Sequence, residues 1–149
     1  MSQAVLNGCR LAGISTCVPS KVIDNVDDTE GFPKDAIKKV VSVAGVSRRH
    51  VSEGGICSSD LCFKAASDLL ERLDWDRDSI DGLIFVTQTP DYFLPSTACM
   101  LHKRLGLSPE CAAFDVGLGC SGYPYGLWMA ALMINSGNKR VLLLHGETP

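Results

Sequence analysis

The residue types best suited to chemistry lie in the stretch Gly117-Leu118-Gly119-Cys120-Ser121-Gly122. The apolar residues 111–116 predict a buried strand and residues 119–136 predict a helix, so we expect Cys120 in the first turn of that helix. Unpaired N–H groups there favour a thiolate, which attacks carbonyl carbons, and they can hold the oxyanion that forms. Gly119 and Gly122 would allow a tight turn and the close approach of a substrate. The spacing therefore indicates nucleophilic catalysis by Cys120.

Two other interpretations of this stretch stay open. The first is that Cys120 is a buried structural cysteine, which is the usual role of a cysteine in a reduced protein. The second is a dinucleotide-binding turn, because Gly117, Gly119 and Gly122 spell G-x-G-x-x-G and Glu147 follows Gly122 by 25 positions. Against the second, the cysteine stands where a pyrophosphate needs the backbone, and only 27 residues follow Gly122.

The remaining cysteines favour neither a metal site nor a disulfide framework. The sequence has seven cysteines, with no Cys-x-x-Cys pair and no pair of histidines at zinc spacing. We therefore expect reduced thiols and no bound metal. Most of these cysteines should be buried as small hydrophobic residues.

Composition limits the class of protein. A length of 149 residues suits one domain, 1–149, and a net charge of −3 gives no reason to expect nucleic acid or anionic lipid as a partner. No apolar run reaches the roughly 18–20 residues of a membrane span, and the N-terminal residues lack the pattern of a secretory signal. We expect a globular, cytoplasmic protein that binds neither nucleic acid nor membrane.

Strand and helix patterns alternate along the chain. Strands are predicted over 9–18, 82–87, 111–116 and 140–145, and helices over 33–44, from Ser58 or Ser59 to 73, over 95–105 and over 119–136. This alternation is typical of an α/β fold with a largely parallel sheet and helices on both faces. Residues 127–134 leave the last helix no polar face, so we expect it to be buried on all sides. Such burial implies a second layer beyond this chain, or a fragment of something larger.

Five stretches stand in the order and spacing of one known family. They are Gly45-Val46-Ser47-Arg48-Arg49-His50, Asp81-Gly82-Leu83-Ile84-Phe85-Val86-Thr87, Leu94-Pro95-Ser96-Thr97-Ala98, Ala113-Phe114-Asp115-Val116 and Gly119-Cys120-Ser121-Gly122. Through them the chain resembles the β-ketoacyl-acyl carrier protein synthase III family of the thiolase superfamily. The last stretch is similar to the family's nucleophile motif. The resemblance runs from about Cys9 to Gly146.

The resemblance implies a thiolase-like fold, which is an α-β-α-β-α sandwich built from two similar halves. This chain would be most of the N-terminal half, with a mixed, mainly parallel five-stranded sheet. The family's catalytic His and Asn belong to the C-terminal half, which would lie outside this chain. His50, His102 and His145 do not match them, and none is assigned to catalysis. The chain by itself should therefore not condense substrates.

The family's chemistry is a decarboxylative Claisen condensation in fatty acid or related biosynthesis. The cysteine takes an acyl group from a thioester, and the carbanion of a decarboxylated malonyl-carrier attacks the acyl-cysteine. By resemblance Cys120 is the nucleophile, its own N–H contributes to the oxyanion hole, and Gly119 and Gly122 border the substrate. Coenzyme A or phosphopantetheine thioesters are the implied substrates, with acyl carrier protein or acyl-CoA as partner and no tightly bound cofactor. Other superfamily members join acetyl units or pass the acyl group to oxygen or nitrogen.

Two departures from the family pattern concern substrate contacts. Lys39 and Val43 align with a Trp and an Arg that contact the nucleotide of coenzyme A, so Lys38 and Lys39 either meet phosphates or form a solvated helix face. Leu94 aligns with a residue, commonly Phe, that reaches across a homodimer to close the partner's acyl pocket, or it only packs at a helix start. The aromatic cluster 91–94 suggests the dimer contact. A non-catalytic scaffold or heterodimer partner is the alternative function.

Overall fold

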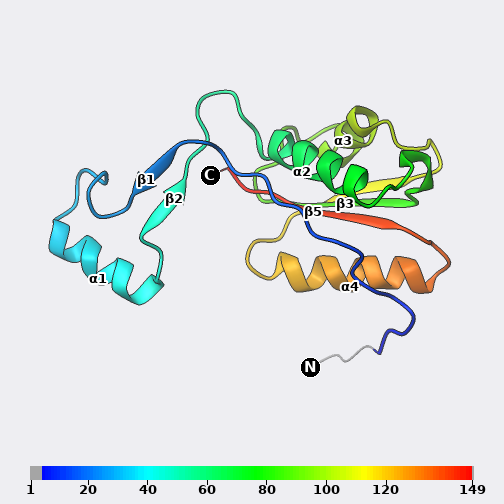
Figure 1. The fold of residues 1–149 in the computed structure, drawn as a ribbon, viewed down its shortest axis with the longest axis horizontal. Coiled ribbons are helices and arrows are strands. Elements are labelled where there is room, and N and C mark those ends of the chain that lie inside the picture. The colour runs from blue at the N-terminus through cyan, green and yellow to red at the C-terminus, as the bar shows by residue number, and fades with distance from the viewer. Residues whose placement is uncertain (1–4, 149) are drawn as a thin grey trace. The chain divides into compact units, whose positions relative to one another are not determined.

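The computed structural model describes residues 5–148, and Figure 1 shows its ribbon. The elements in chain order are β1 (Val22–Asp24), α1 (Lys34–Ala44), β2 (Arg48–His50), α2 (Ser58–Arg72), a short 3-10 helix (Arg77–Ser79), β3 (Gly82–Val86), α3 (Thr97–Leu105), β4 (Ala112–Val116), α4 (Gly122–Asn135) and β5 (Val141–His145). Residues 18–56 form one compact unit, and the described residues on either side of them form another.

The larger unit is built on a parallel sheet of three strands in the order β4-β3-β5. Gly82 lies level with Ala112 on one side and with Val141 on the other. The carboxylate of Asp81, just before β3, connects the start of this strand to the start of β5. It accepts hydrogen bonds from the N–H groups of Lys139 (2.6 Å) and Arg140 (3.0 Å). These bonds, the one from Arg140 foremost, lower the pKa of Asp81. The α/β class and the parallel sheet are confirmed, but the described residues supply three of the five expected strands.

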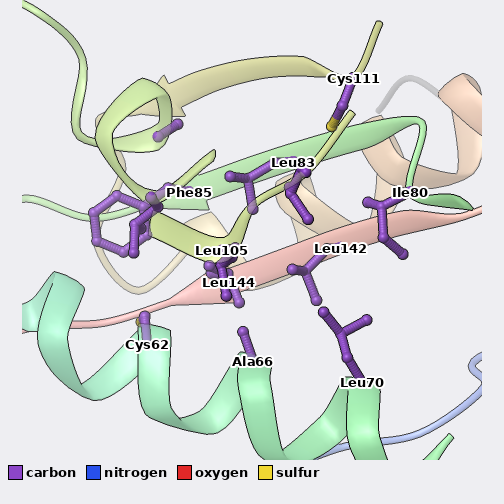
Figure 2. Packing of buried hydrophobic residues seen from close by; sticks show 13 residues of the cluster. Cys62, Ala66, Leu70, Ile80, Leu83, Phe85, Leu105, Cys111, Leu142 and Leu144 are labelled. Carbon is purple, nitrogen blue, oxygen red and sulfur yellow. The ribbon is translucent and has the colours of Figure 1, made fainter. Parts of the chain in front are cut away.

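Helices cover both faces of this sheet. Helices α2 and α3 lie on one face and α4 lies on the other (Figure 1). Side chains alternate along β3, so Leu83 and Phe85 point into the α2–α3 layer while Val86 meets α4. The core on the α2–α3 side consists of buried apolar side chains (Figure 2). Its labelled members are Cys62, Ala66, Leu70, Ile80, Leu83, Phe85, Leu105, Cys111, Leu142 and Leu144.

Local signals set the helix ends close to the predicted positions. The N-cap of α2 is Cys57, one residue before the predicted Ser58, and its N–H donates to the Asp60 carboxylate at 3.0 Å. Ser96 caps α3 directly after Pro95, and its hydroxyl accepts a bond from the N–H of Cys99. Gly106 ends α3 in the left-handed conformation, at φ 65°.

The strand predicted over 9–18 does not form. These residues pair with no strand in the described part of the chain, and the segment lies against α2 instead. The Ser15 hydroxyl donates to the Asp68 carboxylate (2.6 Å), and the Arg72 guanidinium donates to the carbonyl of Ile14 (3.3 Å). Gly13 lies so close to α2 that a Cβ there would stand 3.0 Å from Leu69 Cδ1. Hydrogen bonds to polar side chains of α2 thus replace the backbone hydrogen bonds that a neighbouring strand would make to this segment.

Two burial predictions fail within this chain. Only Gly122 and Gly126 of α4 are buried, and the outer side chains Tyr125, Trp128 and Leu132 remain exposed. Strand β4 was expected to be buried but lies at the edge of the described sheet, where Phe114 is exposed. A helix this apolar normally packs on more than one side. The exposed apolar face of α4 agrees with the expectation that further protein layers pack against this chain.

The unit formed by residues 18–56 contains a two-stranded antiparallel ribbon and one helix. Strand β1 pairs with β2 so that Val22 lies opposite His50. Helix α1 begins after Pro33 and ends at Gly45 in the left-handed conformation (φ 72°), as the sequence predicts. None of its residues is buried, and Val40 and Val43 are largely exposed.

Candidate functional site

Cys120 lies in the turn that joins β4 to α4, just outside the carboxyl end of the sheet. Its side chain is exposed. The helix begins at Gly122 with Ser121 as its N-cap, so Cys120 precedes the first helical turn rather than lying within it. The N–H of Gly122 closes the turn on the carbonyl of Gly119 at 2.7 Å. The strand-to-helix junction is therefore as predicted, while the interpretation of Cys120 as a buried structural cysteine is wrong.

The glycines of the turn make room for the protein's own side chains. Neither Gly119 nor Gly122 has a positive φ. A Cβ at Gly119 would lie 2.6 Å from the Gln88 Oε1 atom, and a Cβ at Gly122 would lie 2.5 Å from the Val86 Cγ1 atom. The absence of side chains thus lets Val86 of β3 and Gln88, two residues beyond it, approach the turn. A substrate-binding role for Gly119 and Gly122 stays a prediction.

Backbone bonds hold the three strand ends beside the turn. The N–H of Thr87 donates to the carbonyl of Val116 (3.1 Å), and the N–H of Gly146 donates to the carbonyl of Val86 (3.3 Å). These two bonds extend the ladders past the last strand residues on either side of β3. In parallel α/β sheets this edge is where ligands bind.

Glu147 is held within the chain rather than offered to a ligand. One carboxylate oxygen accepts a bond from the N–H of Gln88 at 2.7 Å, and the other accepts one from the Thr89 hydroxyl at 3.1 Å. Because both oxygens already accept bonds within the chain, this geometry gives no support to the dinucleotide interpretation of Gly117, Gly119 and Gly122. Sequence analysis singled out Glu147 only for that interpretation and did not identify Gln88.

The segment that carries Leu94 has a fixed base and an exposed tip. At its base, the Ser59 hydroxyl donates to the Asp91 carboxylate (2.5 Å), and the N–H of Asp91 donates to the Thr97 hydroxyl (3.0 Å). At its tip, Phe93 is 98% exposed and Leu94 is 87% exposed. Leu94 therefore makes little contact with the rest of this chain. This excludes the interpretation that Leu94 only packs at the start of a helix. Asp91 belongs to the cluster 91–94 that the sequence suggests as a dimer contact, but its hydrogen bonds make it an anchor of the segment.

Lys38 and Lys39 lie at exposed positions of α1, in the unit that does not contain Cys120. No hydrogen bond or ion pair of their side chains occurs among residues 5–148. A phosphate-binding role for them stays a prediction. In this structure both side chains are exposed to solvent, as the alternative of a solvated helix face expects.

The three histidines have different surroundings, and each lies with a partner inside the chain. The Nδ1 atom of His50 is 2.6 Å from the carbonyl oxygen of Pro19, and the Nε2 atom of His102 is 2.8 Å from that of Ser108. His102 is half-buried. The His145 ring lies 5.3 Å from the Tyr123 ring, and desolvation lowers the pKa of His145.

All seven cysteines are free, but most of them are not buried. Cys62 and Cys111 are the buried ones, and burial raises the pKa of Cys62 to about 12 and that of Cys111 to about 11. The expectation of mostly buried thiols is wrong: Cys9, Cys99 and Cys120 are exposed, and Cys17 and Cys57 are half-buried. Among residues 5–148, no cluster of three or more His, Cys, Asp or Glu side chains could hold a metal ion. No helix in that range is long and apolar enough to cross a membrane.

No protein-family model matches the chain. The individual proteins that it resembles carry similar names. A Campylobacter jejuni protein with the provisional name 3-oxoacyl-(acyl-carrier-protein) synthase 3 is 43% identical over 142 residues, which are 93% of this chain and 40% of that protein. The solved 3-oxoacyl-(acyl-carrier protein) synthase of Burkholderia xenovorans is 48% identical, with a TM-score of 0.88 over 93% of this chain and 40% of that one. The synthase III of Aquifex aeolicus is 27% identical, with a TM-score of 0.78 over 93% and 44%.

The parallel sheet and its two helix layers, together with the similarity to solved synthases, define a thiolase-like α/β chain. More particularly, the chain is homologous to the 3-oxoacyl-(acyl-carrier-protein) synthases of type III, as the sequence resemblance indicated. It spans about 40% of the length of the curated relative that it matches. That share agrees with a chain that corresponds to one half of the larger enzyme.

Proposed function

We propose that the protein containing this chain is an acyltransferase of the 3-oxoacyl-(acyl-carrier-protein) synthase III type, in which Cys120 carries the acyl group. The observation that supports this most is the position of Cys120. Its exposed thiol stands in the turn between β4 and α4 at the carboxyl edge of a parallel sheet. A relative that is 43% identical carries the name of a synthase 3, and a solved relative that is 48% identical carries the name 3-oxoacyl-(acyl-carrier protein) synthase.

In the first step, the Cys120 thiolate attacks the carbonyl carbon of an acyl thioester of coenzyme A or of a carrier. A bond forms between Cys120 Sγ and the acyl carbon, and the bond to the donor sulfur breaks. The donor leaves as a thiolate and takes up the proton that Cys120 has lost. Backbone N–H groups at the start of α4, together with the N–H of Cys120, are suited to hold the oxyanion.

In the second step, a malonyl-carrier thioester loses CO₂ and its C2 carbanion attacks the acyl carbon on Cys120. A carbon–carbon bond forms, and Cys120 leaves as a thiolate. None of His50, His102 and His145 is assigned to this step. We assign the groups that assist decarboxylation to the remaining half of the protein. The acyl carrier protein, or an acyl-CoA, is the proposed partner in these two steps.

The exposed tip formed by Phe93 and Leu94 is proposed to contact the second subunit of a homodimer and to border its acyl pocket. The side chains are nearly fully exposed on a base fixed by Asp91, which suits a preformed contact. If so, Leu94→Trp should shorten the acyl chain that the enzyme accepts. An unchanged chain-length profile would remove Leu94 from the pocket.

The exposed side chains of Lys38 and Lys39 are proposed to meet the phosphates of coenzyme A or of phosphopantetheine. Replacing both with Glu should raise the KM for the acyl donor, because like charges would face each other. An unchanged KM would leave these lysines as a solvated helix face.

Condensation itself provides the test. The full-length protein is mixed with an acyl-CoA and malonyl-acyl carrier protein, and both CO₂ and the 3-oxoacyl product are measured. Cys120→Ser should lower the rate by at least about a thousandfold, because a hydroxyl is a far weaker nucleophile than a thiolate. Cys99→Ser is the matched control, since Cys99 is also exposed but lies on α3. Wild-type rates in Cys120→Ser would refute the proposal.

A further inference from the structure

The carboxylate of Glu147 links the chain after β5 to the chain after β3. Its two oxygens accept bonds from the N–H of Gln88 (2.7 Å) and from the hydroxyl of Thr89 (3.1 Å). The Thr89 hydroxyl in turn accepts a bond from the N–H of Thr148 at 3.2 Å. One of these bonds, a short one to a charged acceptor, thus holds the backbone of Gln88, and the other two hold the side chain of Thr89.

The residue fixed in this way lies directly against the nucleophile turn. A Cβ at Gly119 would be 2.6 Å from Gln88 Oε1, 3.0 Å from its Cδ and 3.3 Å from its Nε2. The carboxamide of Gln88 therefore covers the space above Gly119, the residue that precedes Cys120 in the chain. The three heavy atoms nearest to that Cβ position all belong to Gln88.

The turn has few other restraints of its own. Its backbone bonds are from Leu118 N–H to the Val116 carbonyl (3.1 Å), from Gly122 N–H to the Gly119 carbonyl (2.7 Å) and from Tyr125 N–H to the Ser121 carbonyl (3.3 Å). The Cys120 side chain is exposed. The neighbouring strand end therefore contacts the turn at two places: Val86 packs on Gly122, and Gln88 packs on Gly119, the residue before Cys120.

We propose that Glu147 is a positioning residue for Cys120, acting through the backbone of Gln88 and the carboxamide that packs on Gly119. The functional part of this inference rests on the proposed role of Cys120 as nucleophile. A fixed turn holds the thiolate and the N–H groups around it in one geometry, and acyl transfer depends strongly on such geometry. The carboxylate acts as a hydrogen-bond acceptor here and transfers no proton.

The role of acceptor can be separated from that of charge. Glu147→Gln keeps an oxygen for the N–H of Gln88 and places an amide beside the Thr89 hydroxyl, which can accept from it. Glu147→Ala removes both bonds. Gln88→Ala leaves the Glu147 bond to the backbone intact but removes the carboxamide above Gly119. Positioning predicts that the Gln variant behaves nearly as wild type and that both Ala variants are impaired.

The test uses the full-length protein and two readouts. Hydrogen exchange of the peptide covering residues 117–122 should become about tenfold faster in Glu147→Ala and in Gln88→Ala, and should return to near the wild-type rate in Glu147→Gln. Exchange in α3 serves as the control and should not change. The rate constant for acylation of Cys120 should fall by about tenfold in both Ala variants, with an unchanged KM for the acyl donor.

The two readouts separate failure of this inference from failure of the proposed function. Unchanged exchange of residues 117–122 in both Ala variants would overturn the positioning role, and so would a Gln variant as impaired as Glu147→Ala. If wild-type Cys120 accepts no acyl group, the proposed function fails, and exchange alone then decides whether Glu147 fixes the turn. Should Glu147→Ala not fold, Gln88→Ala still tests the contact through which Glu147 would act, and unchanged exchange in that variant overturns the inference.

Discussion

The carboxylate of Asp115, near the end of β4, accepts a hydrogen bond of 2.7 Å from the N–H of Thr97 at the start of α3. Its second oxygen accepts one of the same length from Ala98. The unpaired N–H groups of a helix start are thereby satisfied by the strand that leads to Cys120. The same helix start follows the exposed segment with Leu94, so Asp115 joins both features of the candidate site.

Asp115→Ala should lower the free energy of unfolding by about 1–3 kcal/mol, because two buried N–H groups lose a charged acceptor. Asp115→Asn should have a smaller effect, since its amide oxygen still accepts one of the bonds. Urea unfolding followed by circular dichroism measures both. Equal stability of the Ala variant and wild type would show that water replaces the carboxylate without loss.

Gly122→Ala should destabilise the fold by about 1–3 kcal/mol, as overpacking of a core does. The added Cβ would be 2.5 Å from Cγ1 of Val86, a buried β-branched side chain with little freedom to move. Gly117→Ala is the matched control, because a Cβ there has no atom within 4 Å. Thermal melting of the two variants should differ by several degrees, and equal melting temperatures would contradict the close packing of α4 on β3.

Cysteine alkylation should sort the thiols by burial. In the native protein near neutral pH, Cys62 and Cys111 should resist iodoacetamide, because burial raises their pKa to about 12 and about 11 and excludes the reagent. The exposed Cys9, Cys99 and Cys120 should react. Peptide mass spectrometry identifies the labelled sites, with a urea-unfolded sample as control. Labelling of Cys62 at the rate of Cys99 would contradict the packing shown in Figure 2.

Stability should fall as the pH drops below about 6.5, the ordinary pKa of histidine. Desolvation lowers the pKa of His145 in the folded protein, so the unfolded chain takes up the proton more readily. Above that pH the ring is neutral in both states and makes no difference. Denaturant titrations across this range measure the effect. His145→Gln should remove part of the pH dependence, and an identical profile for this variant would exclude His145 as its source.

Sequence periodicity located most elements of the sheet and its helices. The apolar runs of β3 and β5 are local patterns, and so are the Pro and Gly residues that bound α1. Interactions between residues close in the sequence are enough to form such elements, so the sequence alone predicts them. The segment 9–18 was misassigned because its β-branched residues fit a strand, whereas strand formation needs a partner edge that local sequence does not encode. Its actual contacts, with Asp68 and Arg72, join residues more than 50 positions apart.

The candidate site was predicted in part. Cys120 was found because a cysteine among glycines between two apolar runs is a local pattern. Gln88, Asp115 and the true contacts of Glu147 were missed because they depend on which strands lie side by side. The order β4-β3-β5 places the residues after β3 between the two other strand ends, and no spacing in the sequence reveals that order.

The most direct test of acyl transfer at Cys120 is the intact mass of the full-length protein after incubation with a panel of acyl-CoA and acyl-carrier thioesters. The account predicts a single adduct of the acyl mass, present in wild type and in Cys99→Ser and absent in Cys120→Ala. The preferred adduct would also identify the acyl group. No adduct with any donor, or an adduct that persists in Cys120→Ala, would contradict it.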